Sequence, residues 1–197
     1  LTLAAISYGI TVFALVLLAV RVRTLLAIYK KGAADPTRRN DKGTRLRMAL
    51  REIFGHTKMF NFTVVGFAHW FVMIGFFALF GTLITAYGQL IDPYFALPVI
   101  GHFWVYEYFT ELIAWATGIG IVTLIGIRQV TRLRNKRSRF YGSGMAKAYY
   151  VEFTILLIVF CVIALRGLEG ALSDETAWNR HFVTTWFIAD MFKSWTL

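Results

Sequence analysis

The residues best suited to chemistry in this sequence are its four histidines, His56, His69, His102 and His181. His69 lies inside the apolar stretch 55–81, and His56 lies at its polar end. An imidazole at bilayer depth is costly unless it is hydrogen-bonded or bound to a metal, so it is a candidate for function. Haem b uses two neutral imidazoles that face each other across a helical bundle. We therefore interpret His69, His56 and His181 as candidate ligands of haem iron, and His102 as a structural residue.

The spacing of His56 and His69 limits how they could act together. If both lie on one helix, the 13 residues between them correspond to about 20 Å of rise, enough to separate two stacked haems. The same spacing places them about 140° apart around the axis, so both face one bundle only if the helix bends or begins after His56. Gly66 and Gly75 would let a macrocycle or another helix approach His69 closely. The alternatives are a hydrogen bond to a neighbouring helix for His69 and a solvated side chain for His56.

Acidic residues within apolar stretches form a second group of candidates. Glu107 and Glu111 are four residues apart and share one face of a predicted helix, and Glu152 lies in another apolar run. Quinone chemistry moves protons together with electrons, so Glu111 and Glu152 are candidate quinone or proton residues. The alternative for Glu152 is an ion pair with Lys147 or with an arginine that reaches toward the membrane surface.

The composition is that of an integral membrane protein. Of 197 residues, 57% are hydrophobic and 17% aromatic, and the mean hydropathy is +0.58, above the values of a soluble domain. Of the 21 Lys and Arg, 11 lie in residues 21–58 and 7 in residues 128–147. Both clusters flank apolar runs, as the positive-inside rule expects, so the net charge of +10 indicates no nucleic-acid partner. Cys161 is the sole cysteine, which excludes a disulfide framework or an iron–sulfur ligand set within this sequence.

We predict an all-α integral membrane fold, a single membrane domain over residues 1–197 embedded in the lipid bilayer. The predicted transmembrane spans are residues 1–20, 59–86, 103–127 and 148–168, since roughly 20 apolar residues cross a bilayer. The positive-inside rule places the basic loops 21–58 and 128–147 in the cytoplasm and the N-terminus outside. The segment TRLRMALREIF (residues 44–54) has apolar residues at four-residue spacing between arginines. This pattern predicts an amphipathic helix on the inner membrane surface.

The outer segment 169–197 is apolar, but it also contains Asp190 and Lys193. These charges favour an outer interfacial helix or an incomplete fifth span. Arg166 and Glu169 are three residues apart and are expected to pair at the end of the fourth span.

The predicted depths leave His69 without a partner ligand. Unless His181 or His102 dips inward, a helix beyond this sequence must supply the second imidazole. We expect the chain to be part of a longer protein, with another span and then a cysteine-rich soluble domain after Leu197.

Three segments in this order resemble a known family: GHTKMFNFTVVGFAHWFVMIGF, IDPYFALPVIGHFWVYEYFTELIAW and IRQVTRLRNKRSRFYGSGMAKAYYVEFTI. They resemble the N-terminal membrane domain of actinobacterial heterodisulfide-reductase-like iron–sulfur oxidoreductases, which look like electron-transfer-flavoprotein:menaquinone oxidoreductases. That domain is similar to the gamma subunit of respiratory nitrate reductase, a five-helix dihaem cytochrome b. The resemblance covers residues from about 45 to the end.

The resemblance implies a multi-pass protein of the bacterial inner (plasma) membrane with one or two haems b. Electrons would pass from an electron-transfer flavoprotein through the clusters of an iron–sulfur reductase domain or subunit, and then through haem b to menaquinone. In the nitrate reductase gamma subunit the second helix supplies two ligands, which correspond here to His56 and His69. The alternative is a non-redox membrane scaffold or transporter fragment with structural histidines.

Overall fold

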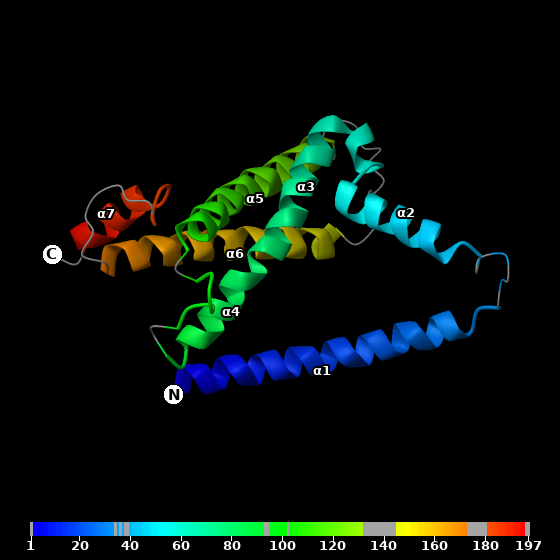
Figure 1. Ribbon diagram of the computed structural model, residues 1–197, viewed down its shortest axis with the longest axis horizontal. Helices are drawn as coiled ribbons and strands as arrows, with labels where there is room; N and C mark the ends of the chain where they lie inside the picture. The colour runs from blue at the N-terminus through cyan, green and yellow to red at the C-terminus, as the bar shows by residue number, and fades with distance from the viewer. Residues whose placement is uncertain are drawn as a thin grey trace. The chain divides into compact units, whose positions relative to one another are not determined.

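The computed structural model describes residues 2–33, 35, 37, 40–92, 95–101, 103–131, 145–172 and 181–195. Within these ranges the chain contains helices and turns and no strand. In chain order the helices are α1 (Thr2–Lys30), α2 (Lys42–Gly55), the 3-10 helix η2 (Met59–Asn61), α3 (Thr63–Ala78), α4 (Phe80–Gln89), α5 (Trp104–Val130), α6 (Met145–Leu172) and α7 (Trp186–Trp195) (Figure 1). The predicted all-α fold is confirmed for this part of the chain.

Four segments of the described chain are long and apolar enough to cross a membrane. They are Thr2–Lys30, Thr63–Gln89, Trp104–Val130 and Met145–Leu172, one for each predicted span. The first helix continues ten residues beyond the predicted end at Val20, because arginine and leucine are good helix formers and no Gly or Pro interrupts the run. The second segment is divided between α3 and α4 at Leu79, although Leu79 N–H still donates to Gly75 O at 2.8 Å.

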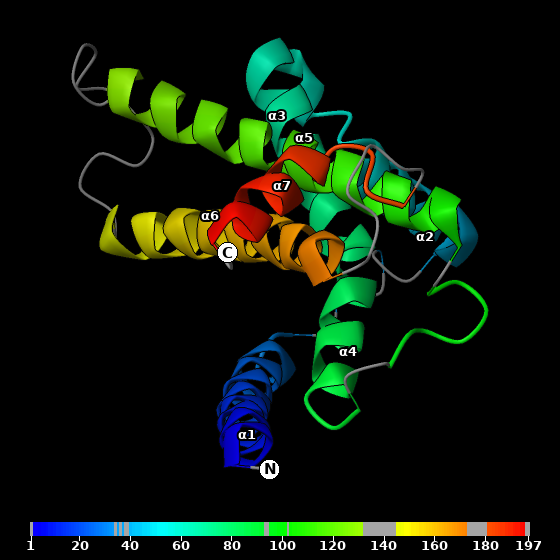
Figure 2. The ribbon, with the colours of Figure 1, turned by 90° about the vertical axis from the view of Figure 1, so that its left-hand side faces the viewer.

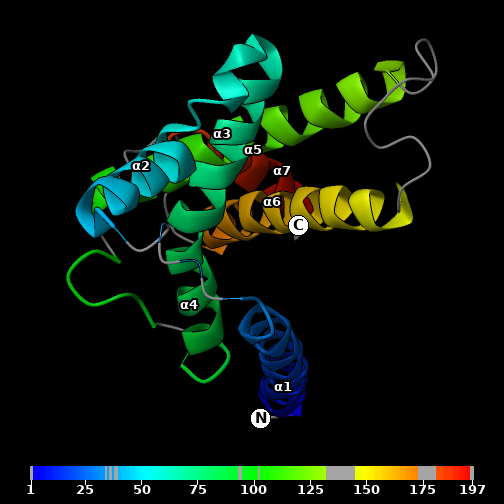
Figure 3. The ribbon, with the colours of Figure 1, turned by 90° about the vertical axis from the view of Figure 1, so that its right-hand side faces the viewer.

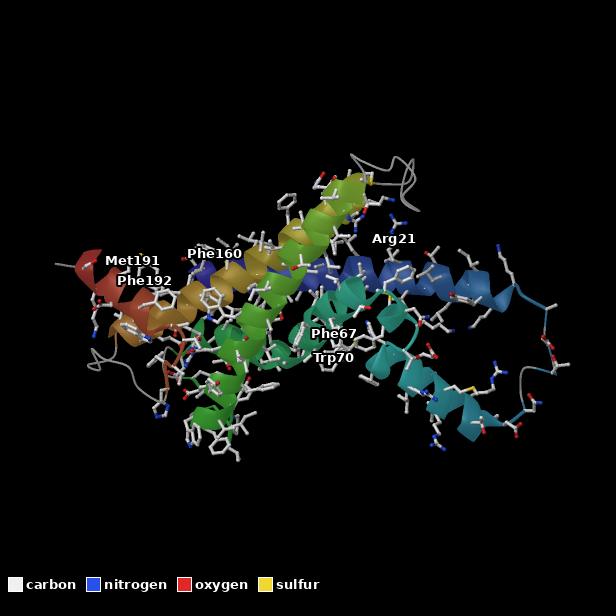
Figure 4. All side chains as sticks on the ribbon, turned by 90° about the horizontal axis from the view of Figure 1, so that it is seen from above. Arg21, Phe67, Trp70, Phe160, Met191 and Phe192 are labelled. Carbon is white, nitrogen blue, oxygen red and sulfur yellow. The ribbon has the colours of Figure 1, made fainter. Side chains whose placement is uncertain are left out.

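Contacts divide the chain into two units, and the first comprises residues 1–55 and 86–95. No residue of α1 is buried, and its charges begin at Arg21 (Figure 4). Inside this unit Tyr8 OH donates to Tyr87 O at 2.9 Å, and the hydroxyls of Thr11 and Tyr87 are hydrogen-bonded. An apolar helix with most of its side chains exposed is typical of a lipid environment.

The second unit, residues 56–85 and 96–197, contains the candidate functional residues. Here α3 crosses α5 (Figures 1 and 3), and small residues allow the two backbones to approach. A Cβ on Gly75 would lie 1.9 Å from Thr117 Oγ1, and a Cβ on Gly120 would lie 2.8 Å from Ala68 O. Thr117 Oγ1 also donates to Ile113 O at 2.7 Å, so its hydroxyl is satisfied at the crossing.

Helix α7 lies against the C-terminal part of α6 (Figures 1 and 2). A Cβ on Gly167 would lie 2.4 Å from Ile188 Cγ2, and a Cβ on Gly170 would lie 3.0 Å from Ala189 Cβ. With ten residues, the described α7 corresponds to the predicted interfacial or incomplete fifth segment. It covers the end of α6 at which Arg166 and Glu169 lie.

Candidate functional site

The first candidate site is the pair formed by His56 and His69. These residues do not share a helix, since α3 begins at Thr63 and His56 lies in the turn after α2. Of the two arrangements considered, one helix with a separation of about 20 Å therefore does not hold, whereas a helix that begins after His56 does. His56 Nε2 and His69 Nδ1 are 3.0 Å apart, with ring centroids separated by 5.1 Å. The helix begins after His56, which is one of the conditions for bringing both imidazoles to one place.

A compact turn places His56 beside α3. His56 has a φ of +47°, in the left-handed region that is unfavourable for a residue with a Cβ. Its carbonyl accepts hydrogen bonds from Met59 N at 2.8 Å and Phe60 N at 3.1 Å. A Cβ on Gly66 would lie 2.6 Å from Met59 O, so glycine is required there for η2 to rest on α3. Gly66 thus positions the turn that carries His56.

The two imidazoles of the pair use different ring nitrogens in their hydrogen bond. The bond to His56 occupies Nδ1 of His69, and Nε2 of His69 has no hydrogen bond to the described residues. A metal-bound histidine usually has its second ring nitrogen fixed by a hydrogen-bond partner. Two axial imidazoles of one iron would have nitrogens about 4 Å apart, twice a metal–nitrogen distance of about 2 Å. The observed geometry therefore fits His69 as a ligand and His56 as its orienting partner, not two opposed ligands.

Two aromatic residues of α3 flank His69 in sequence. Phe67 and Trp70, three residues apart, project from α3 on either side of it in sequence (Figure 4). Phe60 packs on Phe67 with ring centroids 4.9 Å apart. Within the described ranges His56 is the one imidazole hydrogen-bonded to His69, so the residues present would supply a single ligand to an iron.

His181 is not brought to His69. Gly120 of α5 meets Ala68, the neighbour of His69, whereas Glu111 lies nine residues earlier on α5, or about 14 Å along the axis. His181 lies beyond even that level, because its Nδ1 is 2.5 Å from Oε2 of Glu107. His102 lies outside the described residues.

The second candidate site is a polar group that we call the Glu111 cluster. It is made of Glu107, Glu111, Arg166, His181, Thr184 and Thr185. Glu111 is only 2% exposed. Its Oε2 accepts hydrogen bonds from Thr184 N at 2.8 Å and Thr184 Oγ1 at 2.6 Å, and its Oε1 accepts one from Thr185 Oγ1 at 2.9 Å. These bonds offset the cost of burying the carboxylate.

Within the cluster, Arg166 links helix α6 to residue His181 of the C-terminal segment. It donates to Glu169 Oε2 at 2.7 Å and to His181 O at 2.5 Å, and its Nη2 lies 3.4 Å from Glu111 Oε1. The guanidinium also lies 4.7 Å from the ring centroid of Phe182. The predicted Arg166–Glu169 pair is confirmed, and it belongs to a larger network that fixes residues 181–185 on α5 and α6.

Glu152 pairs with an arginine, as one of the two alternatives predicted. Arg128 Nε of α5 donates to Glu152 Oε1 of α6 at 2.6 Å. Beside them Gln129 Nε2 donates to Tyr149 OH at 2.9 Å. The other oxygen of Glu152 is buried and has no hydrogen bond within the described chain.

Three residues in or beside the Glu111 cluster were not predicted from the sequence: Thr184, Thr185 and Trp115. Trp115 Nε1 donates to Thr184 Oγ1 at 3.1 Å. A signal for them exists in the sequence. A carboxylate buried on an apolar helix requires donors, and the Thr184–Thr185 pair directly precedes the apolar residues of α7.

Among the residues described, no group of three or more His, Cys, Asp or Glu side chains could hold a metal ion. Comparisons with known proteins add no relative: no family model, no curated protein and no solved structure matches the chain.

Proposed function

We propose that this chain is the membrane part of a redox complex of the bacterial inner membrane. It would be a cytochrome b-type domain that carries electrons from a cytoplasmic iron–sulfur or flavoprotein donor through haem b to menaquinone. The observation that carries the proposal is the bond between His56 Nε2 and His69 Nδ1, which leaves Nε2 of His69 for a ligand. Four long apolar helices and the clustered basic residues support a multi-pass topology with the N-terminus outside.

His69 would hold the haem iron, and haem b when bound supplies one-electron redox chemistry. In this proposal Nδ1–H of His69 donates to Nε2 of His56, which fixes the ring orientation and makes the ligand more basic. Among the described residues, His69 is the one that this proposal assigns to the iron.

The two buried carboxylates would have different roles in quinone chemistry. Both oxygens of Glu111 accept hydrogen bonds from threonines, so this residue serves chiefly to fix residues 181–185. Glu152 has one oxygen bonded to Arg128 and one buried oxygen without a hydrogen bond in the described chain. Glu152 is therefore the better candidate to take up a proton beside a quinone.

A non-redox membrane scaffold or transporter fragment is the second candidate function. One observation favours it, because imidazoles that bond each other already satisfy one nitrogen of each ring. In that case the pair would serve only to attach the turn at His56 to α3.

An optical difference spectrum separates the two functions. The protein is purified from its native membranes in detergent, and the dithionite-reduced spectrum is compared with the oxidised one. The redox proposal expects the alpha band of a b-type cytochrome. A featureless spectrum from protein whose haem supply was adequate would contradict it and favour the scaffold.

A further inference from the structure

Helix α2 has the side-chain distribution of a membrane-surface helix. At 100° per residue, an apolar sector contains Leu46, Ala49, Leu50, Ile53 and Phe54. Three arginines, Arg45, Arg47 and Arg51, lie at the borders of this sector and on the opposite face. The fourth cation, Lys42, lies within the sector at the first residue of the helix. Glu52 is the only acid of the helix.

The apolar sector of α2 is exposed. No residue of the helix is buried, and Leu46 and Leu50 are 62% and 46% exposed. The four cationic residues are also exposed. A helix of 14 residues that leaves this much apolar surface uncovered in water would be only marginally stable.

The position of α2 in the chain limits what can cover it. Residues 31–41 connect it to α1 and residues 56–62 connect it to α3, and both neighbours are candidate membrane spans. These connections tether α2 at both ends to a candidate span.

We propose that α2 binds an anionic lipid surface, with its apolar sector in the acyl-chain boundary and its cations on the headgroup phosphates. Charge complementarity selects this occupant, because a net positive helix is attracted to phosphatidylglycerol or cardiolipin. A nucleic acid would pair with the cations and leave the apolar sector uncovered. The proposal concerns the first unit and is independent of the haem proposal.

The test uses the full chain reconstituted in nanodiscs, with Cys161 replaced by alanine. Leu46→Cys places an environment-sensitive fluorophore in the apolar sector, and Thr44→Cys places it about 160° away on the polar face. Discs contain either phosphatidylcholine alone or a mixture with about one third phosphatidylglycerol, and some lipids carry a quencher on the acyl chain. In the mixed discs the label at position 46 is expected to be quenched and the label at position 44 to remain accessible to aqueous iodide.

Removing positive charges from α2 distinguishes attraction to anionic lipid from burial of the apolar sector alone. Each cation is expected to contribute roughly fivefold to the surface-bound population, so Arg45→Gln, Arg47→Gln and Arg51→Gln together should release most of the label from the quencher. Lys31→Gln, outside α2, is the matched control and should leave quenching nearly unchanged. Equal quenching at position 46 in neutral and anionic discs, or equal quenching at both positions, would overturn the proposal. Protection that appears only when a soluble partner protein is added would also overturn it and assign α2 to a protein interface.

Discussion

At the scale of single residues, two histidines that look equivalent in the sequence have different surroundings, one in a turn and one within α3. The proposal gives His56 the role of supporting His69 through one hydrogen bond and gives His69 the role of iron ligand. The sequence presents both as imidazoles on one apolar stretch, and only the turn at residues 56–62 makes their roles different.

His56→Ala tests this difference in roles. The variant should retain haem, because Nε2 of His69 is unchanged, but the ligand becomes less basic without its acceptor. The haem midpoint potential should therefore shift to a more positive value, measured by redox titration of the alpha band. Complete loss of haem in this variant, with His56→Gln behaving in the same way, would make His56 a ligand instead.

Glu111 should stabilise the fold more than Glu169, the other acid that pairs with Arg166. Glu111→Ala removes the acceptor of Thr184 and Thr185 and one of the two carboxylates that pair with Arg166. Because Glu111 is buried, the loss should lower the free energy of unfolding by about 3–5 kcal/mol. Thermal unfolding in detergent should show a lower midpoint, and a protease should cleave residues 181–185 more readily. The matched control is Glu169→Gln, since Glu169 also binds Arg166 but its side chain is 39% exposed, and its loss should cost below about 1 kcal/mol. Equal effects of the two variants would contradict the network described.

At the scale of elements, close helix contact depends on particular glycines. Gly75→Ala should destabilise the crossing of α3 and α5 by about 1–3 kcal/mol, because the new Cβ would collide with Thr117. Gly126 lies in α5 with no atom within 4 Å of an added Cβ, so Gly126→Ala should be neutral or stabilise by up to about 1 kcal/mol. Unfolding midpoints in detergent compare the two. An unfolding midpoint in Gly75→Ala as high as in Gly126→Ala would show that α3 and α5 do not pack at this point.

The elements themselves were largely predictable, but their contacts were not. Runs of apolar residues about 20 long identify spans directly, and the amphipathic spacing in residues 44–54 identified α2. The turn at His56 escaped prediction because it requires a left-handed backbone at a histidine and a glycine at position 66 that receives η2. The link from Glu111 to Thr184 joins residues 73 apart, and spacing along one helix carries no information about such a pair.

At the scale of the whole molecule, charge distribution predicts the topology. In a Cys161→Ala background, Lys31→Cys lies in the predicted cytoplasmic loop and Val99→Cys, at a position 98% exposed, lies on the predicted outer side. A membrane-impermeant maleimide should label position 99 in intact cells and position 31 only after permeabilisation. Labelling in the reverse order would mean that the N-terminus faces the cytoplasm.

The central claim is that His69 holds haem iron, and haem stoichiometry tests it most directly. Haem per chain is measured as the pyridine haemochrome in the full protein purified from membranes, for the unaltered chain, His69→Ala and His181→Gln. His181→Gln keeps a polar group beside Glu107 and should retain the haem of the unaltered chain. His69→Ala should lose the haem that its imidazole binds, while still inserting and purifying with a normal yield. Retention of haem in His69→Ala at the stoichiometry of the unaltered chain would contradict the account.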